Sequence, residues 1–389
     1  MNILVLSQFY PPDLGAVAFR MEAIVNTMRD KGHSVYVLAA TPNRYKEFKV
    51  ELSHTSTPYE TRIEMKNTSQ SNLSRIRGFF EFYNKSIKTK KYYKTKNIDL
   101  VISTTPYVLE GLAGQKIAKY LKAKHLLDVR DLWPDTPIAL GKIKSNGLIA
   151  FLLKRIEKKL YKNTDHIIVT SPGYVGHVKA IAPSKPIDVI LNGIDTNFEN
   201  DYEVFKETNT KKHNEKIKVL YAGNIGIAQN LTTLIKAAYK LKEDFEFQLV
   251  GSGTQLIEVK ELIKLHGLNN VDIVPPVKRE MLYSYYMSAD ILYLQLYSSE
   301  YFSKVVPSKI FEYLLLQKPI VYGLEGVSKD ILCKYEDTYH VIPDNYEHLV
   351  KTLESIDIEK NTSRDIKSLR RIIQINRYSK VIENILEER

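Results

Sequence analysis

The sequence predicts an α/β protein of two doubly wound domains that face each other across a cleft. Three observations lead to this fold class. Short apolar runs alternate with helical patterns, which is the order expected for parallel sheets covered by helices. The alternation restarts at Lys218, after a polar and charged stretch over 197–216. The chain has 389 residues, which is long enough for two separate hydrophobic cores.

The composition is that of an ordinary globular protein, with 44% hydrophobic and 26% charged residues. The net charge of +11 favours a negatively charged partner, such as nucleotide phosphates, nucleic acid or an anionic membrane. The single cysteine, Cys333, excludes an internal disulfide framework and a multi-cysteine metal site. No apolar run has the length of a membrane span, and the first residues lack the basic start of a signal peptide. We therefore expect a cytoplasmic protein.

The first half begins with a strand–helix–strand unit, predicted as a strand over 3–6, a helix over 16–31 and a strand over 34–40. Gly15 stands directly before the helix, where a residue without a side chain lets the backbone approach a phosphate or sugar closely. A turn glycine without a ligand is the alternative, and the incomplete G-x-G-x-x-G pattern favours it when this motif is taken alone. Further strands are predicted over 99–103, 125–129, 166–170 and 187–191, with a helix over 108–121.

Two segments of the first half are predicted to be basic amphipathic helices. The first covers 75–96, and its apolar face consists of Ile76, Phe79, Phe80, Tyr83 and Ile87. The second covers 149–163, and its apolar face consists of Ile149, Leu152, Leu153, Ile156 and Leu160. Lysines and arginines surround both faces. Such a helix can lie in an anionic membrane interface, or it can pack on a core with a solvated basic side, and both hypotheses stay open.

The strand over 125–129 runs into a charged loop that contains the single tryptophan, with the sequence Asp128-Val-Arg-Asp-Leu-Trp-Pro-Asp135. Ligands of open parallel sheets bind at the carboxyl ends of the strands, so we expect this loop to contact a ligand. The candidates for acceptor contact or proton handling are Asp128, Arg130, Asp131 and Asp135. A loop braced by an Arg–Asp pair is the alternative for Asp128 and Asp135.

The second half repeats the pattern, with strands predicted over 218–222, 246–250, 271–274 and 291–296. Glycine-containing loops follow the first two strands, at 223–229 and 251–253. The stretch over 306–322 is the segment around which we interpret this half. Ser308 is a preferred helix N-cap, and Lys309 and Glu312 lie on one side of the first helical turn. The N-terminus of the helix suits an anion, and the carboxylate suits sugar hydroxyls.

The predicted elements divide the chain into four parts. These are a first domain over 1–198, a linker over 199–216, a second domain over 217–375 and a C-terminal helix over 376–389 that can pack back on the first domain.

Several motifs in this order resemble the GT-B glycosyltransferases of family 4, a group of retaining enzymes that use nucleotide sugars. They are Phe9-Tyr-Pro-Pro12 with Gly15, the loop from Asp128 to Pro134, Asn192-Gly-Ile-Asp195, Tyr221-Ala-Gly-Asn-Ile-Gly226, Val250-Gly-Ser-Gly253, and Pro307-Ser-Lys-Ile-Phe-Glu312 followed by Lys318-Pro319. The resemblance covers essentially the whole chain and implies two Rossmann-like domains. The chain also resembles the branch that builds bacterial capsule and O-antigen repeat units, which includes enzymes similar to N-acetylfucosamine transferases.

The resemblance implies a donor site in the second domain, where Glu312 binds the ribose hydroxyls. The implied donor-binding residues are Gly15, Gly223, Asn224, Gly226, Gly251, Gly253, Lys304, Ser308, Lys309 and Glu312. The family usually has an arginine and a lysine where this chain has Asn224 and Gln229, so Lys304 and Lys309 are the expected substitutes. Lys304 also replaces the first glutamate of the family's Glu-x7-Glu pair. We expect Arg130, Asp131 and Lys309 to be catalytic. We expect the acceptor to bind Tyr10, Trp133 and Asp135. The resemblance implies that no metal or cofactor is needed.

The implied reaction is transfer of a sugar, with retention, from a nucleotide sugar to a polyprenyl-diphosphate-linked glycan at the inner membrane face. We expect a UDP-linked donor, and the two basic helices would contact the anionic membrane surface. A GT-B-like nucleotide-sugar epimerase is one alternative. A basic nucleic-acid-binding protein, which charge alone suggests, is the other. His125 and the tyrosines of 283–286 are expected to have structural roles.

Overall fold

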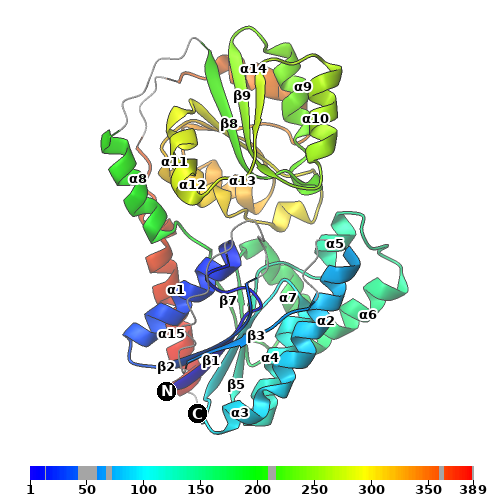
Figure 1. Cartoon of the computed structure of the whole chain (residues 1–389), viewed down its shortest axis with the longest axis vertical. Helices are drawn as coiled ribbons and strands as arrows, with labels where there is room; N and C mark the ends of the chain where they lie inside the picture. The colour runs from blue at the N-terminus through cyan, green and yellow to red at the C-terminus, as the bar shows by residue number, and fades with distance from the viewer. Residues whose placement is uncertain (14, 43–58, 67–71, 209–215, 359–362, 388–389) are drawn as a thin grey trace. The chain divides into compact units, whose positions relative to one another are not determined.

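The chain forms two compact units in a computed structural model, which describes residues 1–13, 15–42, 59–66, 72–208, 216–358 and 363–387 (Figure 1). Unit 1 comprises Met1–Asn192 together with Ile372–Arg389, and unit 2 comprises Gly193–Arg371. The prediction of two doubly wound α/β units is confirmed, because each unit has its own parallel sheet and its own hydrophobic core.

The described part of unit 1 contains a seven-stranded parallel sheet in the order β3-β2-β1-β4-β5-β6-β7. The strands are β1 (Asn2–Leu6), β2 (Ser34–Ala40), β3 (Glu60–Ile63), β4 (Leu100–Thr104), β5 (Lys124–Val129), β6 (His166–Val169) and β7 (Ile187–Val189). The strand order reverses between β1 and β4. Their carboxyl ends therefore border the topological switch point, which is the crevice where open α/β sheets bind ligands.

Helices cover both faces of the unit 1 sheet, with α1 and α15 on one side and α2 and α4 on the other (Figure 1). The helices are α1 (Ala16–Asp30), α2 (Asn72–Lys88), α3 (Lys90–Lys94), α4 (Val108–Leu121), α5 (Asp135–Ala139), α6 (Leu148–Lys162), η1 (Pro172–Tyr174), α7 (Val175–Ile181) and α15 (Arg371–Glu387). Successive residues of β1 face opposite layers, because Ile3 and Val5 pack with α1 and α15 while Leu4 and Leu6 pack with α2 and α4.

The described part of unit 2 contains a six-stranded parallel sheet in the order β10-β9-β8-β11-β12-β13. The strands are β8 (Ile217–Asn224), β9 (Phe245–Ser252), β10 (Val271–Val274), β11 (Ile291–Gln295), β12 (Ile320–Gly323) and β13 (Thr338–His340). This order also reverses next to the first strand of the unit, between β8 and β11.

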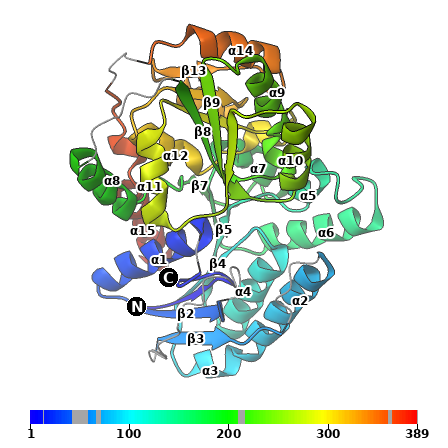
Figure 2. The same ribbon diagram turned by 45° about the horizontal axis from the view of Figure 1, so that its top comes forward.

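The helices of unit 2 lie on both sides of this sheet, with α9 and α10 on one side and α11 and α12 on the other (Figure 2). They are α8 (Thr196–Thr208), η2 (Ile227–Gln229), α9 (Thr232–Lys240), α10 (Leu256–Leu265), α11 (Arg279–Ser288), η3 (Phe302–Lys304), α12 (Lys309–Leu315), α13 (Val327–Leu332), α14 (Tyr346–Ser355) and η4 (Lys367–Leu369).

The segment expected to be a linker over 199–216 contains most of a helix, α8, and residues 209–215 lie outside the described residues. Phe198, Tyr202 and Phe205 recur at helical spacing along α8. The rings of Phe198 and Phe205 each stack on Tyr283, at centroid distances of 5.1 Å. These three aromatic side chains form an apolar face that the surrounding charges obscure in the sequence. The boundary between the units therefore falls at 192–193, and α8 belongs to unit 2.

The C-terminal helix α15 begins at Arg371, five residues before the start we expected. Ile375, Tyr378, Ile382, Ile385 and Leu386 of α15 lie in the core cluster of unit 1. The second domain accordingly ends at Arg371 rather than at residue 375.

Candidate functional site

Glycines at the carboxyl edge of the unit 2 sheet let two neighbouring loops approach closely. A side chain on Gly251 would place its Cβ 1.9 Å from the carbonyl oxygen of Gly223, and the φ of Gly251 is +151°. A side chain on Gly253 would place its Cβ 2.3 Å from the carbonyl oxygen of Ile225. Both obstructing atoms belong to the backbone and have little freedom to move. The end of β9 and the loop that follows it therefore require glycine at positions 251 and 253.

Lys309, Glu312 and Tyr286 form a hydrogen-bonded triangle beside Gly223. Lys309 Nζ lies 2.7 Å from Glu312 Oε2 and 2.9 Å from Tyr286 Oη. The Tyr286 hydroxyl donates to the same Glu312 oxygen at 2.9 Å. A Cβ on Gly223 would lie 3.8 Å from Lys309 Cε, so the lysine side chain lies against the glycine backbone. The structure thus brings three predicted donor-binding residues, Gly223, Lys309 and Glu312, together at the carboxyl edge of the sheet.

The two charged side chains of the triangle are accessible, whereas the tyrosine is buried. Lys309 and Glu312 are 27% and 28% exposed, and Tyr286 is fully buried. Burial, together with the nearby negative charge of Glu312, raises the pKa of Tyr286 well above its usual value. The phenol therefore remains protonated and acts as a permanent donor to the carboxylate. A cation and an oriented carboxylate face solvent from one helical turn.

Two further basic side chains hold the helices that carry this triangle. Arg364 donates to two carbonyl oxygens at the C-terminal end of α12, those of Tyr313 at 3.0 Å and Leu314 at 3.1 Å. Lys318 Nζ donates to the carbonyl oxygen of Met287, near the end of α11, at 2.7 Å. Positive groups at helix C-termini satisfy carbonyl oxygens that have no partner within the helix, and they interact favourably with the helix dipole.

Three other predicted donor-binding residues lie outside the Lys309–Glu312–Tyr286 triangle. Ser308 occupies the N-cap position of α12, but its side chain makes no capping hydrogen bond because its backbone is already helical. Lys304 forms an ion pair with Glu300 at 2.9 Å. Asn224 Nδ2 donates to Gln229 Oε1 at 3.0 Å, which joins the two ends of the loop after β8. The predicted N-cap position of Ser308 is confirmed, and the donor contacts of these three residues stay predictions.

In unit 1, Arg130 and Asp131 follow β5 at the carboxyl edge of the sheet. Arg130 Nη1 donates to the carbonyl oxygen of Ala16 at 2.9 Å, at the start of α1 directly after Gly15. Burial raises the pKa of Asp131 to about 6, although the positive charge of Arg130 and a hydrogen bond with Tyr174 act in the opposite direction. The structure therefore places the Arg130 side chain at the start of α1, next to Gly15, and Asp131 beside Arg130 and Tyr174.

Asp128 has a structural role. It is fully buried, and Arg20 Nε donates to its Oδ2 at 2.9 Å. The alternative of a braced loop is confirmed for Asp128, with Arg20 of α1 as the partner. His125 is also structural, as predicted, because Ser103 and Thr164 bond its two ring nitrogens, and burial lowers its pKa to about 3.

Glu110 is a buried carboxyl at the same edge that the sequence analysis did not select. It lies in the first turn of α4 and is 4% exposed. The backbone N–H of Gln8, just after β1, donates to Glu110 Oε1 at 2.9 Å. Burial raises the pKa of Glu110 to about 8, against the lowering effect of this hydrogen bond and of the positive charge of Arg130.

The three predicted acceptor residues differ in what they offer a ligand. Tyr10 is 4% exposed and packs in the core of unit 1, so its ring does not line a surface, and burial raises its pKa to about 12. Trp133 is partly exposed and meets the ring of Tyr107 edge-on, with a centroid distance of 5.5 Å. Asp135 begins α5, and its Oδ2 lies 3.4 Å from Nδ1 of His177. Trp133 and Asp135 stay candidates, whereas Tyr10 is a core residue because it follows β1 into the interior.

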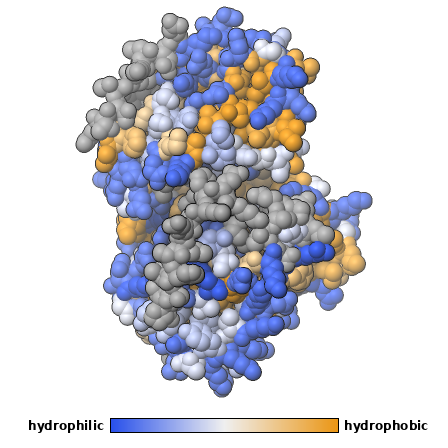
Figure 3. Space-filling view, in the orientation of Figure 1, coloured by the Kyte–Doolittle hydropathy of each residue, from blue (hydrophilic) through white to orange (hydrophobic). Residues whose placement is uncertain are grey.

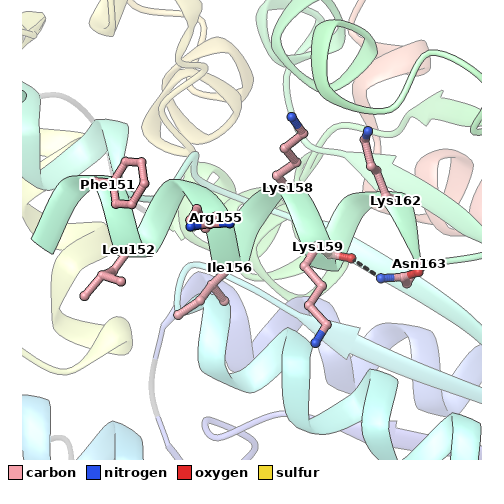
Figure 4. A pocket seen from close by; sticks show the side chains of 8 residues that line it. All are labelled: Phe151, Leu152, Arg155, Ile156, Lys158, Lys159, Lys162 and Asn163. Atoms are coloured by element: carbon pink, nitrogen blue, oxygen red, sulfur yellow. Dashed lines mark hydrogen bonds between the residues drawn. The ribbon is translucent and has the colours of Figure 1, made fainter. Parts of the chain in front are cut away.

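Helix α6 exposes apolar side chains next to basic ones. Its first two turns carry Leu148, Ile149, Phe151 and Leu152, which are between 50% and 72% exposed. Leu152, Ile156 and Lys159 leave one side of α6, and Phe151, Lys158 and Lys162 leave the other (Figure 4). The C-terminal half of α6 instead packs on unit 1 through Leu160 and Tyr161. Apolar and charged residues therefore lie side by side over this helix (Figure 3).

Helix α2 is mainly a core-packing helix. Phe82 is buried, and Tyr83 and Ile87 pack against the same core cluster. Ile76 and Phe80 are about half exposed, at 51% and 53%. Core packing thus describes most of α2, whereas the first half of α6 is exposed. Contact of either helix with a membrane stays a prediction. Among the described helices, none is long and apolar enough to cross a bilayer.

Comparison with known families accounts for nearly the whole chain. Residues 17–198 match the model of Glycosyltransferase Family 4, and residues 203–374 match the model of Glycosyl transferases group 1. The chain belongs to glycosyltransferase family 4. In this family 4 enzyme the Lys309–Glu312–Tyr286 triangle lies in the part matched by the second model, and Glu110, Arg130 and Asp131 lie in the part matched by the first.

Individual relatives agree with this assignment. A protein of Escherichia coli named as the colanic acid biosynthesis glycosyl transferase WcaI is 24% identical over 293 residues, which cover 71% of this family 4 chain and 72% of WcaI. Sucrose-phosphate synthase of Thermosynechococcus elongatus has a similar structure, with a TM-score of 0.78 at 16% identity over the full length of both chains. HepE of Anabaena in complex with UDP has a TM-score of 0.71 at 15% identity, covering 99% of this chain and all of HepE. The two structures establish the GT-B fold.

Proposed function

We propose that this glycosyltransferase moves a sugar, with retention, from a UDP-linked donor to a polyprenyl-diphosphate-linked glycan in bacterial surface polysaccharide synthesis. The observation that carries the proposal is the Lys309–Glu312 pair, which stands open to solvent beside the glycine loops at the carboxyl edge of the unit 2 sheet. The similarity to WcaI supports the polysaccharide pathway, and the UDP complex of HepE supports the nucleotide.

In the proposed donor site, Glu312 accepts hydrogen bonds from the ribose hydroxyls. The Glu312 side chain is 28% exposed, so its solvent-facing side can accept hydrogen bonds from hydroxyls while it retains its bonds to Lys309 and Tyr286. The Lys309 ammonium lies against Gly223, where backbone and cation can both meet the diphosphate. Lys309 then stabilises the negative charge of the departing diphosphate, and the proposal requires no metal or cofactor.

In the proposed acceptor site on unit 1, Arg130 and Asp131 contact the acceptor, with Trp133 as an apolar wall. The lipid-linked acceptor would bring the enzyme to the inner face of the cell membrane. The exposed apolar turns of α6 and its basic residues fit such an anionic surface, because the side chains can enter the interface while the lysines meet lipid phosphates. α2 contributes less, since most of its apolar face lies in the core.

A thermal-shift screen against UDP, GDP, ADP and their sugars tests the donor site. UDP at about 100 times its Kd should stabilise the protein by about 2.7 kcal/mol, which is a rise in Tm of about 5–10 °C for a unit of this size. Glu312→Ala should remove this rise and leave the Tm of the unliganded protein nearly unchanged, because Glu312 is partly exposed. Glu258→Ala is the matched control, since Glu258 is an exposed first-turn glutamate of α10 in the same unit.

An unchanged UDP shift in Glu312→Ala would remove this residue from the donor site. Mass spectrometry of a synthetic polyprenyl-diphosphate glycan incubated with the enzyme and UDP-sugars then tests the reaction itself. Formation of an epimeric nucleotide sugar without acceptor, and no glycan extension with it, would contradict the proposed transfer.

A further inference from the structure

Glu110 stands at the topological switch point of unit 1. Its helix, α4, starts after β4, and its partner Gln8 follows β1, so the contact spans the two strands between which the strand order reverses. Arg130, which follows β5, is the charged group that acts on Glu110. Groups from the ends of three adjacent strands therefore converge on one buried carboxyl, at the place where open parallel sheets bind ligands.

Only one of the two oxygens of the Glu110 carboxyl accepts a hydrogen bond from the described residues. Glu110 Oε1 accepts the N–H of Gln8. Oε2 accepts no hydrogen bond from the described residues, and it is not one of the side-chain oxygens that are closed off from solvent. A buried carboxyl that is half satisfied costs stability compared with an apolar side chain of the same size. The bond to Gln8 explains the position of Oε1 and leaves Oε2 without a structural role. The open Oε2 points to a ligand that completes its hydrogen bonding.

We propose that Glu110 belongs to the acceptor subsite, where Oε2 of the neutral carboxyl donates a hydrogen bond to a hydroxyl of the acceptor sugar. The inference rests on the proposed transferase function and deepens it. A neutral group suits this position, because it binds sugar without repelling the diphosphate of a lipid-linked acceptor. The raised pKa, about 8, is consistent with a carboxyl that carries its proton at neutral pH.

Two variants separate binding from structure. Glu110→Gln keeps a carbonyl oxygen for the Gln8 N–H and replaces the donating O–H by an N–H, so it imitates the neutral carboxyl at every pH. Glu110→Ala removes both groups. At pH 7 we expect the KM for acceptor to be nearly unchanged in Glu110→Gln and to rise by about tenfold or more in Glu110→Ala. The KM for the UDP-sugar and the UDP-induced Tm shift should stay at wild-type values in both.

The pH dependence distinguishes the wild type from Glu110→Gln. Above about pH 8 the wild-type carboxyl ionises and can no longer donate, so the acceptor KM of the wild type should rise while that of Glu110→Gln stays flat. A similar acceptor KM profile in both proteins, or a wild-type acceptor KM in Glu110→Ala, would overturn the inference alone. Absence of glycan transfer by the wild type with every UDP-sugar would overturn the proposed function, and the acceptor role with it.

Folding provides a readout that is independent of activity. The folded carboxyl has a pKa of about 8 and the unfolded one about 4.5, so the folded state binds more protons between these values. The Tm contribution of Glu110 is therefore fully present below pH 4.5 and is lost as pH rises towards 8. The Tm of Glu110→Gln relative to the wild type should rise over this window. A constant difference would contradict the buried, neutral carboxyl on which the inference depends.

Discussion

At the scale of single residues, Arg364 binds the C-terminal turn of α12, the helix that carries Lys309 and Glu312. Its guanidinium is 1% exposed and pairs with Asp337, which is 2% exposed. It also donates to the carbonyl oxygens of Tyr313 and Leu314, in the last turn of α12. Removal of one partner from a buried pair leaves an uncompensated charge, which is more costly than the loss of the attraction itself. We therefore treat Arg364 as a residue that positions Lys309 and Glu312 through the helix that carries them.

Arg364→Met should lower the free energy of unfolding of unit 2 by about 3–5 kcal/mol, measured by urea denaturation. The double variant Arg364→Met with Asp337→Leu should lose less, because no buried charge is then left without a partner. Lys329→Met is the control, since its pair with Glu325 is 41% exposed on both sides and should contribute about 0–1 kcal/mol. Equal losses in Arg364→Met and Lys329→Met would show that burial of the pair has no energetic consequence.

The sequence predicts some of the site residues well and others not at all, for a physical reason. Lys309 and Glu312 share a helical turn after a polar loop, so local spacing alone places them together. Tyr286 joins them from α11, and no periodicity links residues that are this far apart in the chain. Glu110 falls within an ordinary helical segment, and its burial depends on packing between β1, β4 and β5 that local patterns do not encode. Tyr10 is the opposite case, because its loop position suggested exposure and the core accommodates its ring.

At the scale of elements, α6 has two halves with different tasks. Its C-terminal half anchors the helix to unit 1 through Leu160, and its N-terminal half exposes apolar side chains. Arg155 lies over the ring of Phe151, 5.4 Å from its centroid, so apolar and basic groups form one continuous surface. The amphipathic pattern was visible in the sequence, but which half is covered depends on tertiary packing, which the local pattern does not encode.

Membrane binding by α6 can be measured by co-sedimentation with vesicles that contain phosphatidylglycerol. Replacement of Lys158, Lys159 and Lys162 by glutamine should weaken binding by about 1 kcal/mol for each lysine, and Phe151→Ser with Leu152→Ser should weaken it through loss of apolar contact. Ile257→Ser is the control, because Ile257 of α10 is 73% exposed among mixed charges. Equal binding of wild type to neutral phosphatidylcholine vesicles, or no effect of either set of replacements, would contradict the role of α6.

The other elements show where sequence patterns are reliable. Buried parallel strands appear as short apolar runs, and the predicted strands of both sheets are confirmed. Helix α8 was missed because its apolar face is made of three aromatic residues among many charges. Burial against Tyr283 of α11, rather than local composition, stabilises that helix.

At the scale of the whole molecule, the two units have separate cores and should respond separately to mutation. Ile382→Ala in α15 removes a fully buried side chain from the core of unit 1 and should cost about 2–5 kcal/mol. Scanning calorimetry with and without UDP should assign the loss to the transition that UDP does not shift. Ile372→Ala on the same helix is the control, because Ile372 is 48% exposed and its replacement should change stability by less than about 0.5 kcal/mol. A loss that appears in the UDP-sensitive transition would show that the units unfold together.

The position of α15 in the chain also has a consequence for synthesis on the ribosome. Unit 1 is interrupted after Asn192 and resumes at Ile372, so all of unit 2 is translated before the last layer of unit 1 exists. During that interval the residues of α1 and of the first sheet that pack against α15 lack their cover. We expect the nascent polypeptide to depend on chaperones over this interval, with unit 2 maturing first although it is made second.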